Sequence, residues 1–466
     1  MNRPFHWRTR AAAAAVAALA LGVVAGCSSS SSSSATAPTT SSSSTAAASG
    51  PASSSSATSS ASASTVSTSS CGTKPGVAAT GTPINIGAIN TKQPGTDFSD
   101  IENMTGAYFA CVNANGGING HPIKFFPETE QTSPPQIEAL AKQLVTTDHV
   151  VGMIGNSSII ECSVDAAYWK SVGIDVLGAG IDPECYSTPN TASVNMGPRY
   201  SSDGAVQYVL AQGANKIAFD QSNVPGTAYI AAGPNAVAKA KGVAIQDFTE
   251  NVPITSANAI ATKLVTAAGP SGAVVLNFTP PEALLILQAA QKLNLEDRVK
   301  YWACSTPCNT DFLATSLGPK WNGKLFVNAE LLPLDGNTSA TAQLFDAILK
   351  QYGTDVSGGV GSFSEMGFTI GEIATHALES ITGPYTIASV SAALEGVKDY
   401  NTGMLCQGYT YGTYSEHIPN NMDYTVTPDN GKFVEASSGG GCTLISASDP
   451  QIAAYRAIAG TAPMAS

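Results

Sequence analysis

The sequence lacks the patterns that mark the common classes of exported enzyme. No Gly-x-Ser-x-Gly elbow is present, so a serine hydrolase is unsupported. His121, His149 and His376 stand far apart and form no metal-ligand spacing. Cys304 and Cys308 are separated by Ser-Thr-Pro instead of the spacing of a Cys-x-x-Cys motif, and no histidine is near them. We therefore expect a non-enzymatic protein that uses neither a metal nor a cofactor.

An excess of positive charge is also absent. The formal net charge is −12, and it becomes −15 when Arg3, Arg8 and Arg10 of the N-terminal segment are set aside. An acidic surface argues against nucleic acid or anionic lipid as a partner. Asp97 and Glu102 lie around the start of a predicted helix, where carboxylates are stabilised by the helix dipole. We favour that structural role over a catalytic pair of acids.

One apolar run stands out, in residues 1–27. It follows three arginines and is too short to span a bilayer, which takes about 20 residues. It ends in Val-Ala-Gly-Cys27, which resembles a bacterial lipobox, although an ordinary secretory signal is the alternative. We expect Cys27 to be acylated, so that the protein is anchored by lipid at the extracytoplasmic face of the cell membrane.

The next segment, residues 28–75, consists mostly of Ser, Ala and Thr. Such a composition cannot bury enough apolar surface to fold. We expect a disordered tether that holds a folded body away from the membrane.

Cysteine usage agrees with export. Apart from Cys27 the chain has an even number of cysteines, as expected in an oxidising compartment. Eight cysteines allow 105 connectivities. Pairing nearest neighbours in sequence gives a guess: Cys71–Cys111, Cys162–Cys185, Cys304–Cys308 and Cys406–Cys442.

The stretch 83–158 alternates between strand and helix patterns. Two short apolar strands and two helical periodicities lead to the run 150–154, which is apolar on both faces, as in a parallel sheet covered on both sides. Strand, helix, strand, helix, strand is a doubly wound α/β unit, which binds ligands at the carboxyl ends of its strands. Residues 156–158 are therefore expected at a ligand cleft.

The same order of patterns repeats after residue 199, which predicts two α/β lobes with a cleft between them. We assign residues 83–198 and about 324–381 to an N-terminal lobe. Residues 199–323 and about 382–463 are assigned to a C-terminal lobe.

Several segments resemble the type I periplasmic-binding proteins, in particular the branched-chain amino acid (leucine/isoleucine/valine) group that feeds ABC importers. They are residues 115–123 (Asn-Gly-Gly-Ile-Asn-Gly-His-Pro-Ile), Ser202-Asp-Gly with Tyr208, and the helix that begins Pro281-Glu-Ala-Leu-Leu. The resemblance covers about four fifths of the chain. It implies a hinged, two-lobed Rossmann-like fold.

For the first lobe the resemblance implies that two loops hold a ligand carboxylate through hydroxyl and N–H groups. The residues at these positions are Ser157, Ser158 and Ile159 in one loop and Ala179, Gly180 and Ile181 in the other. The family often has threonine where Ile181 falls. Phe98 either lines the cleft or packs elsewhere.

For the second lobe the resemblance implies contacts near Pro225 and near Thr279. Tyr229 is a substitute for a family tyrosine, and Phe278 lies beside Thr279. The acidic residue that holds a ligand ammonium should fall at Ser305 or Thr306, both of which are neutral. Carboxylates elsewhere remain candidates for that role: Glu161, Asp182 and Glu365.

These features predict a solute-binding receptor that delivers its ligand to the permease of an ABC importer. The expected ligand is small and polar or carboxylated: amino-acid-like, an amide, or a short organic acid. We expect a monomer. The alternative is a sensory module with the same fold that signals through a membrane partner.

Overall fold

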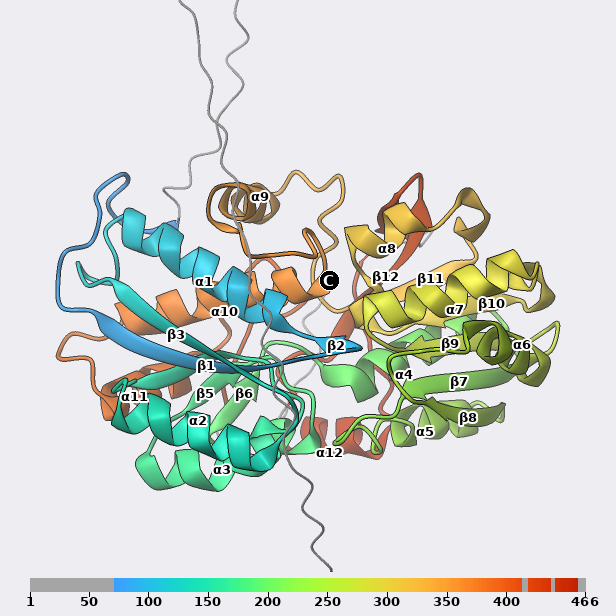
Figure 1. The fold of residues 1–466 in the computed structure, drawn as a ribbon, viewed down its shortest axis with the longest axis horizontal. Helices are drawn as coiled ribbons and strands as arrows, with labels where there is room; N and C mark the ends of the chain where they lie inside the picture. Colours follow the sequence, from blue (N-terminus) through green and yellow to red (C-terminus); the bar gives the residue numbers. More distant parts are fainter. Residues whose placement is uncertain (1–70, 413–417, 437–440, 460–466) are drawn as a thin grey trace, which may run out of the picture. The chain divides into compact units, whose positions relative to one another are not determined.

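The computed structural model describes residues 71–412, 418–436 and 441–459. Its strands form two sheets, each covered by helices (Figure 1). We name the first sheet and the helices packed on it the first lobe, and the second sheet with its helices the second lobe. This confirms the predicted α/β class. In the described part of the chain no helix has the length and apolar character that a membrane span requires.

The first sheet runs in the order β3, β1, β4, β5, β6, with every neighbouring pair parallel, and a short β2 pairs antiparallel with β1. Its strands are β1 (Ile84–Gln93), β2 (Thr96–Asp97), β3 (Ile123–Glu130), β4 (Gly152–Asn156), β5 (Val176–Gly178) and β6 (Thr191–Ser193). Helices α1 (Ser99–Ala114) and α10 (Ser362–Glu379) lie along one face, with α2 (Pro134–Thr146) and α3 (Glu161–Val172) along the other (Figure 1). Two more helices pack on this lobe: α9 (Ala340–Tyr352) on α1, and α11 (Ile387–Glu395) on α10 and β4.

The central strands of this sheet are apolar on both faces because each face covers a separate core. Ile154 and Leu177 pack with α1 and α10, whereas Met153 and Val176 pack in the cluster that contains Trp169 of α3. Successive side chains of a strand point to opposite faces, so one apolar run serves both cores.

The second sheet runs in the order β8, β7, β9, β10, β11 with parallel pairing, and β12 and β13 extend it antiparallel. Its strands are β7 (Lys216–Ser222), β8 (Ala244–Glu250), β9 (Ala273–Asn277), β10 (Tyr301–Cys304), β11 (Leu325–Ala329), β12 (Met422–Asp429) and β13 (Lys432–Glu435), and β14 (Thr443–Leu444) pairs with β12. The helices are α4 (Gly197–Ala211), α5 (Ala232–Ala240), α6 (Ala257–Ala268), α7 (Pro280–Lys292), α8 (Asp311–Ser316) and α12 (Pro450–Ala459). Short 3₁₀ segments are η2 (Pro183–Tyr186), η3 (Glu296–Arg298), η4 (Thr306–Cys308) and η5 (Pro319–Trp321).

The second sheet alternates in the same way. Val274 and Leu276 of β9 pack in the core with α6 and α7, whereas Ala273 and Val275 pack in the core with α4 and α5. Glycine, with φ +71° at Gly269, ends α6 just before β9.

The connections between the lobes correct part of the predicted division. The strand near 324–328 was expected to return to the first lobe, but β11 pairs with β10 and β12, and all of its residues are buried in the second sheet. The chain returns to the first lobe only at α9, which packs on α1. Helix α11 and the side chains of Tyr409 and Tyr411 also belong to the first lobe, although residues beyond 382 were assigned to the second.

The disulfide guess is confirmed, since the described chain contains the bridges Cys71–Cys111, Cys162–Cys185, Cys304–Cys308 and Cys406–Cys442. The bridge at Cys71, together with the hydrogen bond from Lys74 N to Asn115 O (2.8 Å), fixes residues 71–75 to the first lobe. The predicted tether therefore stops before Cys71 instead of at 75. Its remainder, the signal segment 1–27 and the acylation site Cys27 lie outside the described residues.

Candidate functional site

A cavity of about 70 Å³ lies where the carboxyl ends of strands from both sheets meet, and we name it the inner cavity. Its walls include loops that follow β4, β5, β7 and β9, the position at which α/β sheets bind ligands. First-lobe residues that line it include Phe98, Ile101, Ile159, Ala179, Gly180, Ile181, Phe363 and Met366. Second-lobe residues that line it include Val224, Thr227, Ile230, Asn277, Phe278, Thr279 and Pro307.

The two lobes touch around this cavity. The hydroxyl of Tyr229 donates to the carbonyl of Ile181, and Thr279 Oγ1 donates to Gly95 O at 3.1 Å. Gly226 approaches the first lobe so closely that an added Cβ would lie 3.1 Å from Ile160 Cγ2. The lobes are therefore in a closed arrangement around the inner cavity.

The sequence-predicted site residues divide into two groups. Those that line the inner cavity are Phe98, Ile159, Ala179, Gly180, Ile181, Phe278 and Thr279. Those that do not line it are Ser157, Ser158, Pro225, Tyr229, Ser305 and Thr306.

The hydroxyls of Ser157 and Ser158 are engaged inside the first lobe. Ser157 Oγ donates to Phe98 O at 3.4 Å, and Ser158 Oγ donates to Glu130 Oε1 at 2.9 Å. Ser158 Oγ also accepts the N–H of Glu161 at 3.1 Å, which satisfies a free donor in the first turn of α3. Both side chains therefore hold their loop in place.

Backbone N–H groups of the same wall are also satisfied. Ile159 N donates to Thr91 Oγ1 at 2.9 Å, and Gly180 N donates to Asn195 Oδ1 at 2.8 Å. A ligand carboxylate at these groups would have to replace bonds that the protein already makes. The first-lobe wall offers a ligand shape and apolar surface more than it offers free donors.

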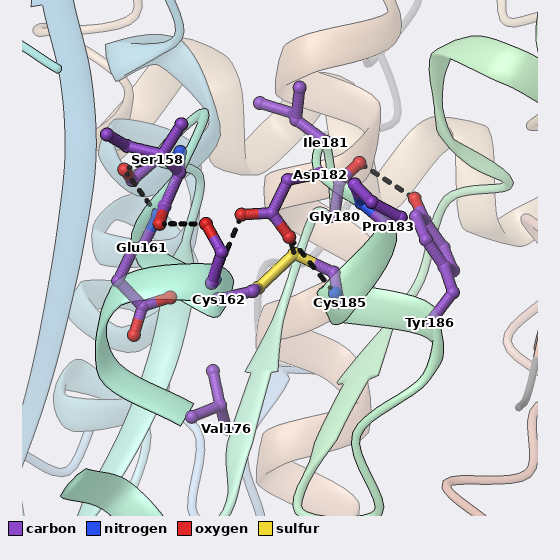
Figure 2. Close-up of a disulfide and its surroundings, with 12 residues drawn as sticks. Ser158, Glu161, Cys162, Val176, Gly180, Ile181, Asp182, Pro183, Cys185 and Tyr186 are labelled. Atoms are coloured by element: carbon purple, nitrogen blue, oxygen red, sulfur yellow. Dashed lines mark hydrogen bonds between the residues drawn. A yellow bond between two sulfur atoms is a disulfide. The ribbon is translucent and has the colours of Figure 1, made fainter. Parts of the chain in front are cut away.

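The two first-lobe loops are joined by the Cys162–Cys185 disulfide, which links the start of α3 to η2 (Figure 2). Asp182 lies beside it and accepts the N–H of Ser163 at 3.0 Å and of Cys185 at 3.2 Å (Figure 2). Tyr186 Oη donates to Gly180 O at 2.7 Å. Burial raises the pKa of Asp182 to about 6, and the bond from the Ser163 N–H opposes that rise.

Cys162, Asp182 and Cys185 also form the one cluster of three potential metal-ligand side chains among the described residues. The two sulfur atoms are bonded to each other and the carboxylate is held by N–H groups. The cluster therefore acts as a structural cross-link of the wall.

On the second-lobe wall Ser305 and Thr306 are fully buried behind the cavity. Ser305 N donates to Leu276 O at 2.9 Å, and Thr306 Oγ1 donates to Asn328 Oδ1 at 2.6 Å. Their neighbour Pro307 reaches the inner cavity. Pro225 is exposed on the outside of its loop.

Sequence reasoning missed Glu330, the one carboxyl side chain among the described residues that line the inner cavity. It is 1% exposed, its carboxylate accepts the N–H of Met196, and its carbonyl accepts Asn420 Nδ2 at 2.7 Å. Burial raises the pKa of Glu330 to about 8, and hydrogen bonds from Met196 and Thr306 oppose the rise. Its place directly after the apolar strand β11 was the available signal, but that strand had been assigned to the other lobe. The carboxylates of Glu161, Asp182 and Glu365 do not line the cavity.

The model of one family, described as "Periplasmic binding protein", matches residues 83–432. The chain belongs to the periplasmic binding protein family. That family consists of extracytoplasmic solute-binding proteins. None of the curated proteins matches the chain.

Solved structures share this periplasmic binding protein fold at low identity. A branched-chain amino acid ABC transporter protein from Thermus thermophilus with bound valine has 14% identity and a TM-score of 0.69, with 82% of this chain and 100% of that chain covered. A fatty acid ABC transporter substrate-binding protein from Thermomonospora curvata has 16% identity and a TM-score of 0.64, with 80% and 93% covered. An R. palustris solute-binding protein in complex with 4-hydroxybenzoate has 16% identity and a TM-score of 0.64, with 78% and 97% covered.

Proposed function

We propose that this periplasmic binding protein captures a small metabolite in the inner cavity and delivers it to an ABC importer. The observation that carries the proposal is the cavity itself, which is lined from both lobes at the carboxyl ends of two parallel sheets. Proteins with this arrangement close on a ligand by a hinge, and the ligand favours the closed state because it contacts both lobes only there.

The lining supports a ligand with an apolar body and one polar end. Phe98, Phe278 and the isoleucines supply the apolar surface, while the polar groups are few and include Asn277, Thr279 and Glu330. An amide, a short organic acid or an amino-acid-like molecule meets this description. Valine and 4-hydroxybenzoate, which are bound in two of the solved structures described above, each carry a carboxylate on an apolar body.

Several hydrogen bonds join the lobes around the cavity, including two between backbone groups: Asp311 N to Val360 O at 2.9 Å and Ser362 N to Asn309 O at 2.8 Å. The Tyr229 and Thr279 hydrogen bonds each stabilise the closed state by about 1 kcal/mol. A ligand that adds a few kcal/mol of contact with both lobes decides between the open and the closed state.

The proposed function also implies a cellular location for the protein. We place the protein at the extracytoplasmic face of the cell membrane, anchored through an acylated Cys27, with the folded body acting as a monomer. Incorporation of a labelled fatty acid, lost in a Cys27→Ser variant, tests this anchoring.

A melting-temperature screen against small organic acids, amides and amino acids tests the function. A ligand that binds only the native protein raises its stability by about 2.7 kcal/mol at a hundredfold excess over Kd. We expect at least one such ligand, confirmed by isothermal titration, and no turnover of it. Turnover of the ligand, or the absence of any stabilising compound across these classes, would contradict the proposal.

A titration with leucine tests whether the ligand is an α-amino acid or a molecule without an ammonium group. Neither Ser305 nor Thr306 offers a charge to a ligand ammonium, whereas Glu330 does so when ionised. We expect weak leucine binding or none, because burial favours the neutral form of Glu330. Micromolar leucine binding would identify an α-amino acid as the ligand, with Glu330 as its partner.

A further inference from the structure

A second cavity, of about 320 Å³, adjoins the inner cavity, and we name it the outer cavity. The first lobe contributes the β1–β2 turn, the first turn of α1 and residues 357–364, and the second lobe contributes the starts of α7 and α8. Thr96, Thr279 and Phe363 line both cavities. These three residues therefore form part of the boundary between the two spaces.

Two contacts form part of the partition between the cavities. One is the hydrogen bond from Thr279 Oγ1 to Gly95 O (3.1 Å), a partly exposed bond of about 1 kcal/mol. The other is made by the ring of Phe363, which meets Phe98 of the inner cavity edge-on with centroids 5.2 Å apart. The hydrogen bond between Thr279 and Gly95 joins the two lobes. The partition therefore changes when the lobes open.

The walls of the outer cavity offer a ligand apolar surface. Phe312 is 41% exposed there, and Phe363, Pro280 and Pro281 form further parts of the lining. Gly358, Gly359 and Gly361 form a stretch of the wall that carries no side chain.

The carboxylates around this cavity are already in use. Asp100 accepts the N–H groups of Ser357 at 2.8 Å and Gly358 at 2.6 Å, and thereby holds residues 357–358 against α1. Asp97 is paired with Lys92 at 3.0 Å, and Glu282 accepts the N–H of Ile254 at 2.7 Å. The acids therefore organise the walls and do not by themselves call for a cationic ligand.

The volumes of the inner and outer cavities indicate whether either one alone could hold a ligand. Ligand pockets usually enclose about 300–1,000 Å³. The inner cavity, at about 70 Å³, is well below this range, whereas the adjoining outer cavity reaches it. We propose that the two cavities are compartments of one binding site, and that the ligand is elongated, with its polar end in the inner cavity and an apolar alkyl or aryl tail in the outer cavity. This rests on the proposed function and narrows its ligand class.

A chain-length series tests the proposal. Isothermal titration of the whole protein would use butanoate, hexanoate, octanoate and decanoate, the matching primary amides, and the ligand found in the melting-temperature screen. Each methylene buried in the outer cavity should tighten binding about fourfold, the equivalent of about 0.8 kcal/mol. Affinity should rise with length once the inner cavity is filled.

A matched pair of variants locates the tail. Phe312→Ala removes the exposed aromatic wall and should weaken the longest bound probe roughly tenfold while leaving the shortest unchanged. Leu285→Ala is the control, because Leu285 on α7 is equally exposed, at 42%, and lines neither cavity. It should leave all affinities unchanged.

Two results would overturn the inference and leave the proposed function standing. One is an affinity that does not rise with length among probes that bind. The other is a screened ligand whose affinity responds equally to Phe312→Ala and to Leu285→Ala. If no probe and no screened compound binds at all, the proposed function fails first and this inference fails with it.

Discussion

The two walls of the inner cavity are built differently. On the first-lobe wall the loops after β4 and β5 are cross-linked to each other by Cys162–Cys185, and Asp182 ties the same two loops by hydrogen bonds. On the second-lobe wall Cys304–Cys308 closes only its own turn. The segment 223–229 is largely exposed and is held mainly by local bonds, such as Thr227 Oγ1 to Val224 O at 2.8 Å.

This difference indicates a division of work between the lobes. The first-lobe wall is a fixed surface whose shape is set before a ligand arrives. The second-lobe wall contributes residues 223–229, which contact the first-lobe wall through Tyr229 and Gly226. Under the proposed function, we therefore expect the first lobe to select ligand shape and the second lobe to control closure.

Removing the two disulfides separately gives the largest contrast. In the chain-entropy account a bridge across 23 residues stabilises by about 3 kcal/mol and one across 4 residues by about 2 kcal/mol. We expect Cys162→Ser/Cys185→Ser to lose more unfolding free energy in urea than Cys304→Ser/Cys308→Ser. The first double variant should also bind ligand more weakly because its wall is no longer fixed. Equal losses in stability and in affinity would contradict the division.

Glycine substitutions sharpen the contrast within the backbone. A Cβ at Gly180 would lie 2.4 Å from Ser193 Oγ and 2.8 Å from Cys185 Cβ, so Gly180→Ala overpacks the first-lobe wall at a cost of about 1–3 kcal/mol. Gly226 has φ +81° and meets only Ile159 and Ile160 of the other lobe. Gly226→Ala places alanine at a positive φ, at a cost of about 1–2 kcal/mol, and should in addition lower ligand affinity through poorer closure. Thermal unfolding and isothermal titration of both variants measure the two effects.

The pH dependence of stability tests the role of Glu330, which lies between the lobes. Its carboxylate accepts the N–H of Met196, and its backbone carbonyl accepts the side-chain N–H of Asn420. Burial raises its pKa from 4.5 to about 8, so the folded protein keeps a proton that the unfolded chain has lost. This contribution is complete below about pH 4.5 and is lost as pH rises toward 8.

We expect the wild-type protein to lose about 2 kcal/mol relative to Glu330→Gln between pH 5.5 and 7, measured by urea unfolding at each pH. Glutamine keeps an oxygen that accepts the Met196 N–H and removes the titration. A constant difference between the two proteins across this range would show that Glu330 is ionised in the folded state.

The smallest effect concerns the hydrogen bond between the walls. Tyr229→Phe removes the bond to Ile181 O and should weaken ligand binding about fivefold, equivalent to about 1 kcal/mol of closure. The melting temperature without ligand should change little, because the bond joins lobes that each have their own core. A large drop in stability without a change in affinity would contradict the role given to Tyr229.

The sequence predicted the features that depend on neighbouring residues. Alternating patterns predicted the two α/β units, and the disulfides join cysteines that are neighbours in the order of cysteines. Ile159 and Phe278, which the family resemblance suggested as site residues, line the inner cavity because each follows closely after a strand, at the edge where such sheets bind ligands.

Features that depend on distant residues were not predictable in this way. The apolar run of β11 fits either sheet, so Glu330 was not recognised as a cavity residue. Ser158 has a hydroxyl suited to a ligand, but its partner Glu130 comes from another strand. The outer cavity combines four segments that lie far apart along the chain.

A crystal structure of the protein with the ligand from the melting-temperature screen tests the central claim most directly. We expect ligand density in the inner cavity, in contact with Ile159 or Ile181 of the first lobe and with Phe278 of the second. Density on one lobe alone, or at a site away from these residues, would contradict it.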